Sequence, residues 1–187
     1  MAAGARVKLL GQRLRKGYKS PPNLGRIGSE KIVSKTIIDG IAGLRARVGS
    51  ELGATEWKTL KFEDIVRFAD ATGDHQWIHV DRARIAKESP FGAPIAHGYY
   101  TLSIIAGLFF EICEVQGVAM VINYGLNKVR FPTPLKEGAR YRLSCKLVEV
   151  KEAGNAHDAL IAATVEIDGS PKPACAAELV FRYFGNR

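Results

Sequence analysis

An aspartate and a histidine five positions apart are the first residues whose types and spacing could do chemistry. Asp74 and His79 lie in the segment GDHQWIHVD, residues 73–81. Gly73 is predicted to end a helix, so we expect both side chains on a loop that helices anchor on each side, a usual place for catalytic groups. A carboxylate and an imidazole that converge there can hold a water molecule and move its protons near neutral pH.

A second candidate follows, where a loop opens into an apolar helix. The segment SPFGAPIAHGYYTLS, residues 89–103, places Ala96, His97 and Gly98 at the predicted start of that helix. Backbone N–H groups at a helix start have no partner inside the helix, and they can bind an oxyanion or a polarised carbonyl. Small residues let a ligand approach the main chain closely. We therefore predict that the backbone of these three residues polarises a thioester carbonyl.

Helices must position both candidates. Apolar spacing predicts one helix over residues 59–71, and Asp81 is placed to cap a short helix that continues to residue 87. Residues 96–113 form the longest predicted helix, and it is apolar nearly all round. Such a helix is expected to be buried on every face.

Strands follow this helix from Val118 onward. Apolar and polar residues alternate over residues 141–147, and the alternation slips at Leu147 and Val148, as a β-bulge would make it. Two further apolar runs cover residues 159–167 and 175–183. An antiparallel sheet can bury an apolar helix only by curling around it, which predicts an α+β hotdog fold. A single copy leaves a strand edge open, so we expect a homodimer.

The two motifs in this order resemble the MaoC-like (R)-specific enoyl-CoA hydratase/dehydratase family. GDHQWIHVD followed by SPFGAPIAHG is most similar to the nodulation-protein-N-like branch, with Gln-Trp between the pair. The resemblance covers residues 48–184, and VRFPTPLKEGARYR, residues 129–142, resembles the family's strand pair beside the central helix.

This resemblance implies a reversible hydration of trans-2-enoyl thioesters, of CoA or of a carrier protein, to (R)-3-hydroxyacyl thioesters. Asp74 and His79 match the acid–base pair that holds the water, and Gly98 matches the backbone donor to the thioester oxygen. Ser103 matches a helix serine in the substrate pocket. Gln76 stands where the commonest family pattern has asparagine, which changes the shape of the pocket and its preference for chain length. The chemistry needs no metal and no redox cofactor.

Positive charge is concentrated before the predicted domain. Residues 1–49 carry a net charge of +9 and the remaining residues −1, which make up the total of +8. We place a basic extension over residues 1–47, with helices over Arg6–Lys16 and Glu30–Arg47, and the domain over residues 48–187. The extension is read as a packing arm, a tail that touches anionic surfaces, or a mitochondrial transit peptide. The nearly neutral domain argues against nucleic-acid binding.

Membrane and secretion signals are not found, so a cytoplasmic location is expected, or the mitochondrial matrix if the N-terminus is a transit peptide. The three cysteines form no CxxC motif and no Cys/His cluster. They predict neither a disulfide nor a zinc site, and they indicate packing residues in a reducing compartment.

Simpler interpretations of the same residues stay open. Asp74 could only cap a turn, His79 could be a buried histidine with its hydrogen bonds satisfied, and the His97 side chain could shape the loop without touching substrate. His75 and His79 could form a metal pair only on a helix and with a third ligand. At the level of function, the alternatives are an acyl-thioester-binding subunit without turnover and a hotdog thioesterase.

Overall fold

The computed structural model describes residues 35–186, which belong to a compact unit that begins at Val33. The helix predicted over Arg6–Lys16 lies outside the described residues. The elements in chain order are β1 (Thr36–Asp39), α2 (Gly40–Ala46), β2 (Glu51–Ala54), β3 (Lys58–Thr59), α3 (Phe62–Thr72), α4 (Trp77–Val80), α5 (Arg82–Glu88), α6 (Gly98–Ile112), β4 (Cys113–Gln116), β5 (Val118–Arg130), β6 (Arg140–Ala153), β7 (Ala156–Ile167) and β8 (Cys175–Gly185).

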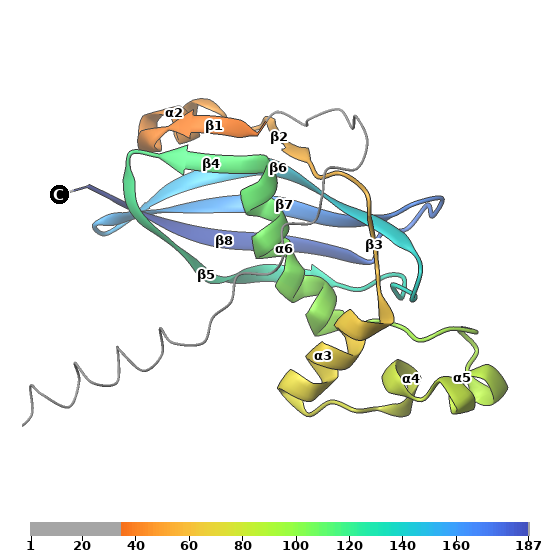
Figure 1. The fold of residues 1–187 in the computed structure, drawn as a ribbon. Helices are drawn as coiled ribbons and strands as arrows, with labels where there is room; N and C mark the ends of the chain where they lie inside the picture. Colours follow the sequence, from red (N-terminus) through yellow and green to blue (C-terminus); the bar gives the residue numbers. More distant parts are fainter. Residues whose placement is uncertain (1–34, 187) are drawn as a thin grey trace, which may run out of the picture. The chain divides into compact units, whose positions relative to one another are not determined.

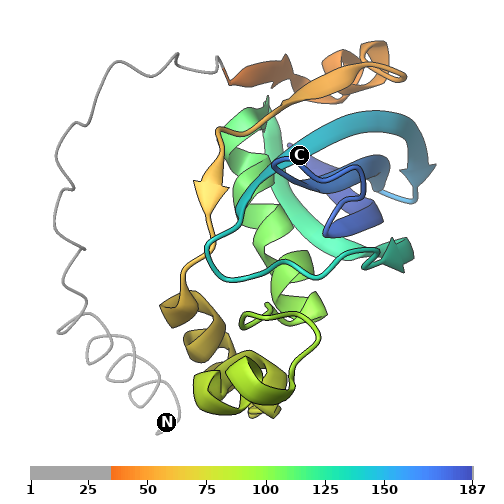
Figure 2. The ribbon, with the colours of Figure 1, turned by 90° about the vertical axis from the view of Figure 1, so that its right-hand side faces the viewer.

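A six-stranded antiparallel sheet packs against the long helix α6 and confirms the hotdog fold (Figures 1 and 2). The strands run in the order β2-β6-β7-β8-β5, and β3 pairs with β6 beside β2. The alternating residues of β6, β7 and β8 point their apolar side chains into the core, as the sequence pattern predicts. The predicted β-bulge is also present, because the register of β6 against β7 shifts between Leu147 and Glu149.

The prediction that α6 is buried on every face is wrong. Tyr99 is 73% exposed and Phe110 is 45% exposed, although the Phe110 ring also stacks on Phe181 of β8. The helix is also shorter than predicted at both ends, and Cys113 already begins β4. One face of this mostly apolar helix therefore lies in the core, and another part of its surface is exposed. The core face consists of Thr101, Ile105, Leu108, Phe109 and Ile112.

Three helices gather at the N-terminal end of α6 (Figure 1). Gly73 ends α3 in a left-handed conformation, with φ of 77°, as predicted. The prediction of a loop is right for Asp74 but wrong for His79, which lies in the single turn of α4. Asp81 caps α5 as expected, because its side chain accepts a hydrogen bond from the Arg84 amide at 2.9 Å.

The described residues before the predicted domain boundary at residue 47 pack into the core. The helix expected over Glu30–Arg47 is divided here, since residues 36–39 form β1, which pairs in parallel with β4, and only Gly40–Ala46 is helical. The side chains of Ile38 and Leu44 are each 1% exposed. Residues 35–47 thus belong to the domain. No helix over residues 35–186 is long and apolar enough to cross a membrane.

Candidate active site

A cavity of about 290 Å³ lies at the N-terminal end of α6. It brings His79, from α4, to the same wall as Gly98, the first residue of α6. His79 and Gly98, which the sequence separates by nineteen positions, therefore share one cavity, whereas Asp74 is not among its lining residues. Its lining residues are His79, Ile95, Ala96, Gly98, Thr101, Phe131, Thr133, Pro134, Leu135 and Ala174.

The hydrogen bonding of His79 fixes which ring nitrogen can act as a base. Its Nδ1 lies 2.7 Å from the carbonyl oxygen of Ile95, and a carbonyl can only accept, so Nδ1 carries the proton. The neutral ring then has its lone pair on Nε2. Only 6% of the residue is exposed, and this burial lowers the pKa of His79 below its usual value. His79 is thus a neutral base at pH 7.

Asp74 lies in the exposed loop before α4 with one carboxylate oxygen engaged and the other open. Oδ1 accepts a hydrogen bond from the Gln76 amide at 3.3 Å, which is the turn-capping role that the simpler interpretation foresaw. One donor or acceptor atom from each of Asp74, His79 and His97 lies within 4.8 Å of the other two. A water molecule that is hydrogen-bonded at about 2.8 Å to two such atoms fits between them.

The His97 side chain contacts both Asp74 and His79. His97 is 2% exposed, and its ring stacks on that of His79 with centroids 3.7 Å apart. Its Nε2 donates a hydrogen bond to the backbone oxygen of Asp74 at 2.8 Å. The structure therefore gives His97 the loop-shaping hydrogen bond of the alternative interpretation, and its side chain is not among those that line the cavity.

The start of α6 offers fewer free amides than the sequence suggests. The Ala96 amide donates to the Leu135 carbonyl at 2.7 Å, so the prediction that it polarises a substrate carbonyl is wrong. The Gly98 amide, by contrast, has no backbone partner over residues 35–186, as expected for the first turn of a helix. A Cβ built on Gly98 would lie 3.0 Å from the Phe131 ring, so a larger residue fits against this wall only if that ring shifts.

Gln76 and Ser103 do not line this cavity. Gln76 is exposed at the residue before α4, and its side chain forms no cap. Ser103 is exposed as well, and its hydroxyl donates to the Tyr99 carbonyl at 2.6 Å. The resemblance placed Ser103 in the substrate pocket and gave Gln76 an influence on the shape of that pocket, but in the structure neither reaches the cavity that His79 lines.

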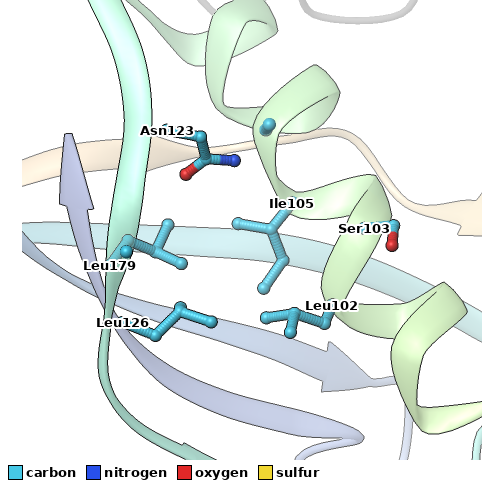
Figure 3. Close-up of a pocket in the computed structure, with 8 residues that line it drawn as sticks. Leu102, Ser103, Ile105, Asn123, Leu126 and Leu179 are labelled. Carbon is cyan, nitrogen blue, oxygen red and sulfur yellow. The ribbon is translucent and has the colours of Figure 1, made fainter. Parts of the chain in front are cut away.

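A second cavity, of about 280 Å³, lies between α6 and β5. Figure 3 shows the side chains of Leu102, Ile105, Leu126 and Leu179 gathered there, with the Asn123 amide beside them. Ser103 is at its border. Thr101 lines the first cavity and Ile105, one turn later, lines the second, so the two hollows follow one another along α6. The second cavity is mostly apolar.

Thr101 and the segment 131–135 are site residues that the sequence analysis missed. Thr101 is 3% exposed, and its hydroxyl donates to the His97 carbonyl at 3.2 Å. Thr101, one turn after Gly98, is one of the few polar side chains on this helix, and this is the signal that the sequence offered. Phe131, Thr133, Pro134 and Leu135 cover the cavity from the segment after β5, within the stretch 129–142 that the resemblance places beside the central helix without assigning it site residues.

Asp74, His79 and His97 offer a carboxylate and two imidazoles, the donor types of many metal sites, but their geometry does not fit one ion. The two rings are nearly parallel, with an angle of 26° between their planes. The nitrogen lone pairs lie in the ring planes. Two ring planes at this angle, with centroids 3.7 Å apart, do not intersect at a point that lies within metal-bonding distance of nitrogens on both rings. Nδ1 of His79 and Nε2 of His97 are also engaged with backbone carbonyls.

The family described as MaoC like domain matches residues 44–168 of this chain. Among curated proteins, 3-hydroxyacyl-thioester dehydratase Z of Mycobacterium tuberculosis is 49% identical over 146 residues, which cover 78% of this chain and 96% of the relative. Nodulation protein N of Rhizobium leguminosarum bv. viciae is 42% identical over 142 residues, with coverage of 75% and 88%.

Solved structures share the fold at lower identity. The R-hydratase PhaJ1 from Pseudomonas aeruginosa superimposes with a TM-score of 0.61 at 23% identity, and covers 74% of this chain and 83% of its own. The (R)-hydratase from A. caviae gives a TM-score of 0.58 at 22% identity, with coverage of 72% and 94%. These likenesses agree with the helix and sheet described above.

Proposed function

This chain belongs to the MaoC-like domain family, and from that premise we propose that it catalyses the reversible hydration of trans-2-enoyl-CoA to (R)-3-hydroxyacyl-CoA. One observation carries the proposal. A ring nitrogen of His79 and a carboxylate oxygen of Asp74 lie within 4.8 Å of each other, within reach of one water molecule, and His79 shares a cavity with the Gly98 amide, which has no backbone partner over residues 35–186.

The proposed reaction begins with a water molecule held between Asp74 and His79. Its oxygen adds to the β-carbon of the enoyl chain, and His79 Nε2 takes the proton that the water gives up. The negative charge that develops on the thioester oxygen is stabilised by the Gly98 amide. The His79 imidazolium then returns the proton to the α-carbon, while the Asp74 carboxylate stabilises the positive charge on the ring. Dehydration follows the same steps in reverse.

We assign the acyl tail to the second cavity, between α6 and β5. This cavity follows the first along α6, and leucine and isoleucine make up four of its eight lining residues. In the proposed CoA substrate, the CoA part would extend outward past the exposed side of the Asp74 loop. If the substrate is a carrier-protein thioester instead, its acyl chain would occupy the same cavity.

A second copy of the chain is the proposed partner. β5 is the last strand of the sheet, and its Met120 and Tyr124 are 49% and 56% exposed, next to the exposed face of α6. A long apolar edge strand is a liability unless it is covered. Met120→Glu should shift the protein to a monomer in light scattering, whereas Val148→Glu should not, because Val148 is equally exposed on the inner strand β6. A wild-type monomer would refute the proposal.

The function is tested by the loss of the enoyl-thioester absorbance of crotonyl-CoA, with the product identified as (R)-3-hydroxybutyryl-CoA. Asp74→Asn and His79→Gln should each lower the rate by about 10²–10⁴ without unfolding the protein. His75→Gln is the matched control, because His75 is exposed and pairs with Asp70 instead. Release of free thiol would show a thioesterase, and saturable binding without turnover would show a binding subunit.

A further inference from the structure

His97 lies behind the acid–base pair and contacts both of its members. It is the residue before α6, it is almost fully buried, and its ring contacts His79 while its Nε2 holds the Asp74 backbone. We infer that His97 is a positioning residue that joins the Asp74 loop, the His79 ring and the start of α6 into one rigid unit. This inference rests on the proposed function and adds to it a residue that acts through two others.

The hydrogen bond to Asp74 fixes a loop that is otherwise held only locally. The Asp74 amide is 3.5 Å from the Thr72 hydroxyl, and the Asp74 carboxylate caps Gln76, so both contacts stay within two residues. The bond from His97 spans 23 positions and reaches the loop from the helix that carries Gly98. Because that helix also carries the carbonyl-binding amide, the bond sets the distance between the water and the thioester oxygen.

Stacking fixes the second member of the pair. The centroid of the His97 ring lies 3.7 Å from that of the His79 ring. It also lies 5.1 Å from the centroid of the Phe68 ring, which is tilted relative to it. His79 is thereby held at Nδ1 by the Ile95 carbonyl and on its face by His97. With both constraints, Nε2 of His79 can point in only one direction. A misplacement of about 1 Å at such a group costs on the order of 10²-fold in rate.

The arrangement also requires opposite tautomers on two stacked imidazoles. His79 must carry its proton on Nδ1 and His97 on Nε2, since each of these nitrogens faces a backbone carbonyl. The Nε2 proton of His97 is held by the Asp74 carbonyl, so His97 supports the site through this hydrogen bond and its stacked ring.

Two substitutions separate the contacts of His97. His97→Gln can keep a donor near the position of Nε2 but loses the ring, and His97→Phe keeps a ring on His79 but loses the donor. His97→Phe should lower kcat by about 10–10² and leave KM within about twofold, because the cavity walls are unchanged. His97→Gln should recover only part of that kcat, because it restores a donor for the Asp74 carbonyl but lacks the ring that supports His79. The control His75→Gln, in the same loop, should match the wild type.

A double variant shows whether His97 acts through Asp74. Once Asp74→Asn has removed the carboxylate, adding His97→Phe should cost little more, since residues that act as a unit are not additive. If the two losses multiply, or if His97→Phe raises KM as much as it lowers kcat, the positioning role is overturned.

Nitrogen NMR of the wild-type histidine rings tests the inference without any turnover. Long-range ¹H–¹⁵N correlation at pH 7 should show His79 protonated at Nδ1 only and His97 carrying a proton on Nε2. Equal tautomers at His79, or a His97 without a proton on Nε2, would overturn the inference even if the enzyme is active. Opposite tautomers in a protein that hydrates no enoyl-CoA would leave the positioning geometry standing and refute the proposed function alone.

Discussion

Gly98→Ala is the perturbation whose effect the structure defines most closely. Gly98 is the first residue of α6, and its backbone angles are ones that alanine adopts without strain. The added Cβ would lie 3.0–3.2 Å from three atoms of the Phe131 ring, closer than the ordinary contact distance of about 3.5–4.0 Å. The methyl group would enter the cavity beside the amide that we assign to the thioester oxygen.

The expected effect on stability is small, and the effect on activity is large. Alanine gains about 0.5–1 kcal/mol over glycine in a helix. Phe131 is 41% exposed, so its ring can move by the few tenths of an ångström needed, and the two effects largely cancel. A methyl group beside the amide hinders the approach of the substrate carbonyl. Loss of one such donor lowers kcat by about 10²–10³, or about 2.7–4 kcal/mol.

The assay compares crotonyl-CoA hydration and thermal unfolding for Gly98→Ala, Gly98→Ala/Phe131→Ala and Gly107→Ala. Gly107 is an exposed position of the same helix with no atom within 4 Å of an added Cβ, so its variant should keep full activity. The double variant removes the steric conflict with the ring and should stay slow. Recovery of activity in the double variant would show that the ring, and not the blocked amide, explains the loss, and would refute the assignment of Gly98.

Three further predictions concern the base, the second cavity and the thiols. Burial lowers the pKa of His79, so the acid limb of the pH profile of kcat/KM should have its midpoint below 6.5. The free energy of unfolding should also fall as the pH drops from 6.5 toward the folded-state pKa of His79, because the unfolded chain binds the proton more tightly in that range. A midpoint above 6.5 would exclude His79 as the base. Ala106→Leu should fill part of the cavity between α6 and β5 and lower kcat/KM for octenoyl-CoA by about tenfold relative to crotonyl-CoA; equal losses for both would contradict the acyl assignment. Burial raises the pKa of Cys145 to about 12 and those of Cys113 and Cys175 to about 11, so a thiol reagent at pH 8 should label none of them before unfolding and all three after it.

Local patterns predicted most of the fold. The left-handed glycine after α3, the Asp81 cap, the alternation of β6 and β8 and the bulge after Leu147 each depend on residues close together in the chain. Where the prediction failed, distant partners decided the outcome. Residues 36–39 form a strand because they pair with β4, more than seventy positions away, and Tyr99 is exposed because the sheet covers only one side of α6.

The sequence by itself determined which chemical groups are present and in what order: a carboxylate, an imidazole, and a helix start without side-chain bulk at Gly98. Only the tertiary structure decided which of them are free to act. It engaged the Ala96 amide with Leu135, turned Ser103 away, and gave His79 and His97 opposite protonated nitrogens. The reason is physical: each hydrogen-bonding group has few partners, and the segments that supply those partners approach only when the chain folds.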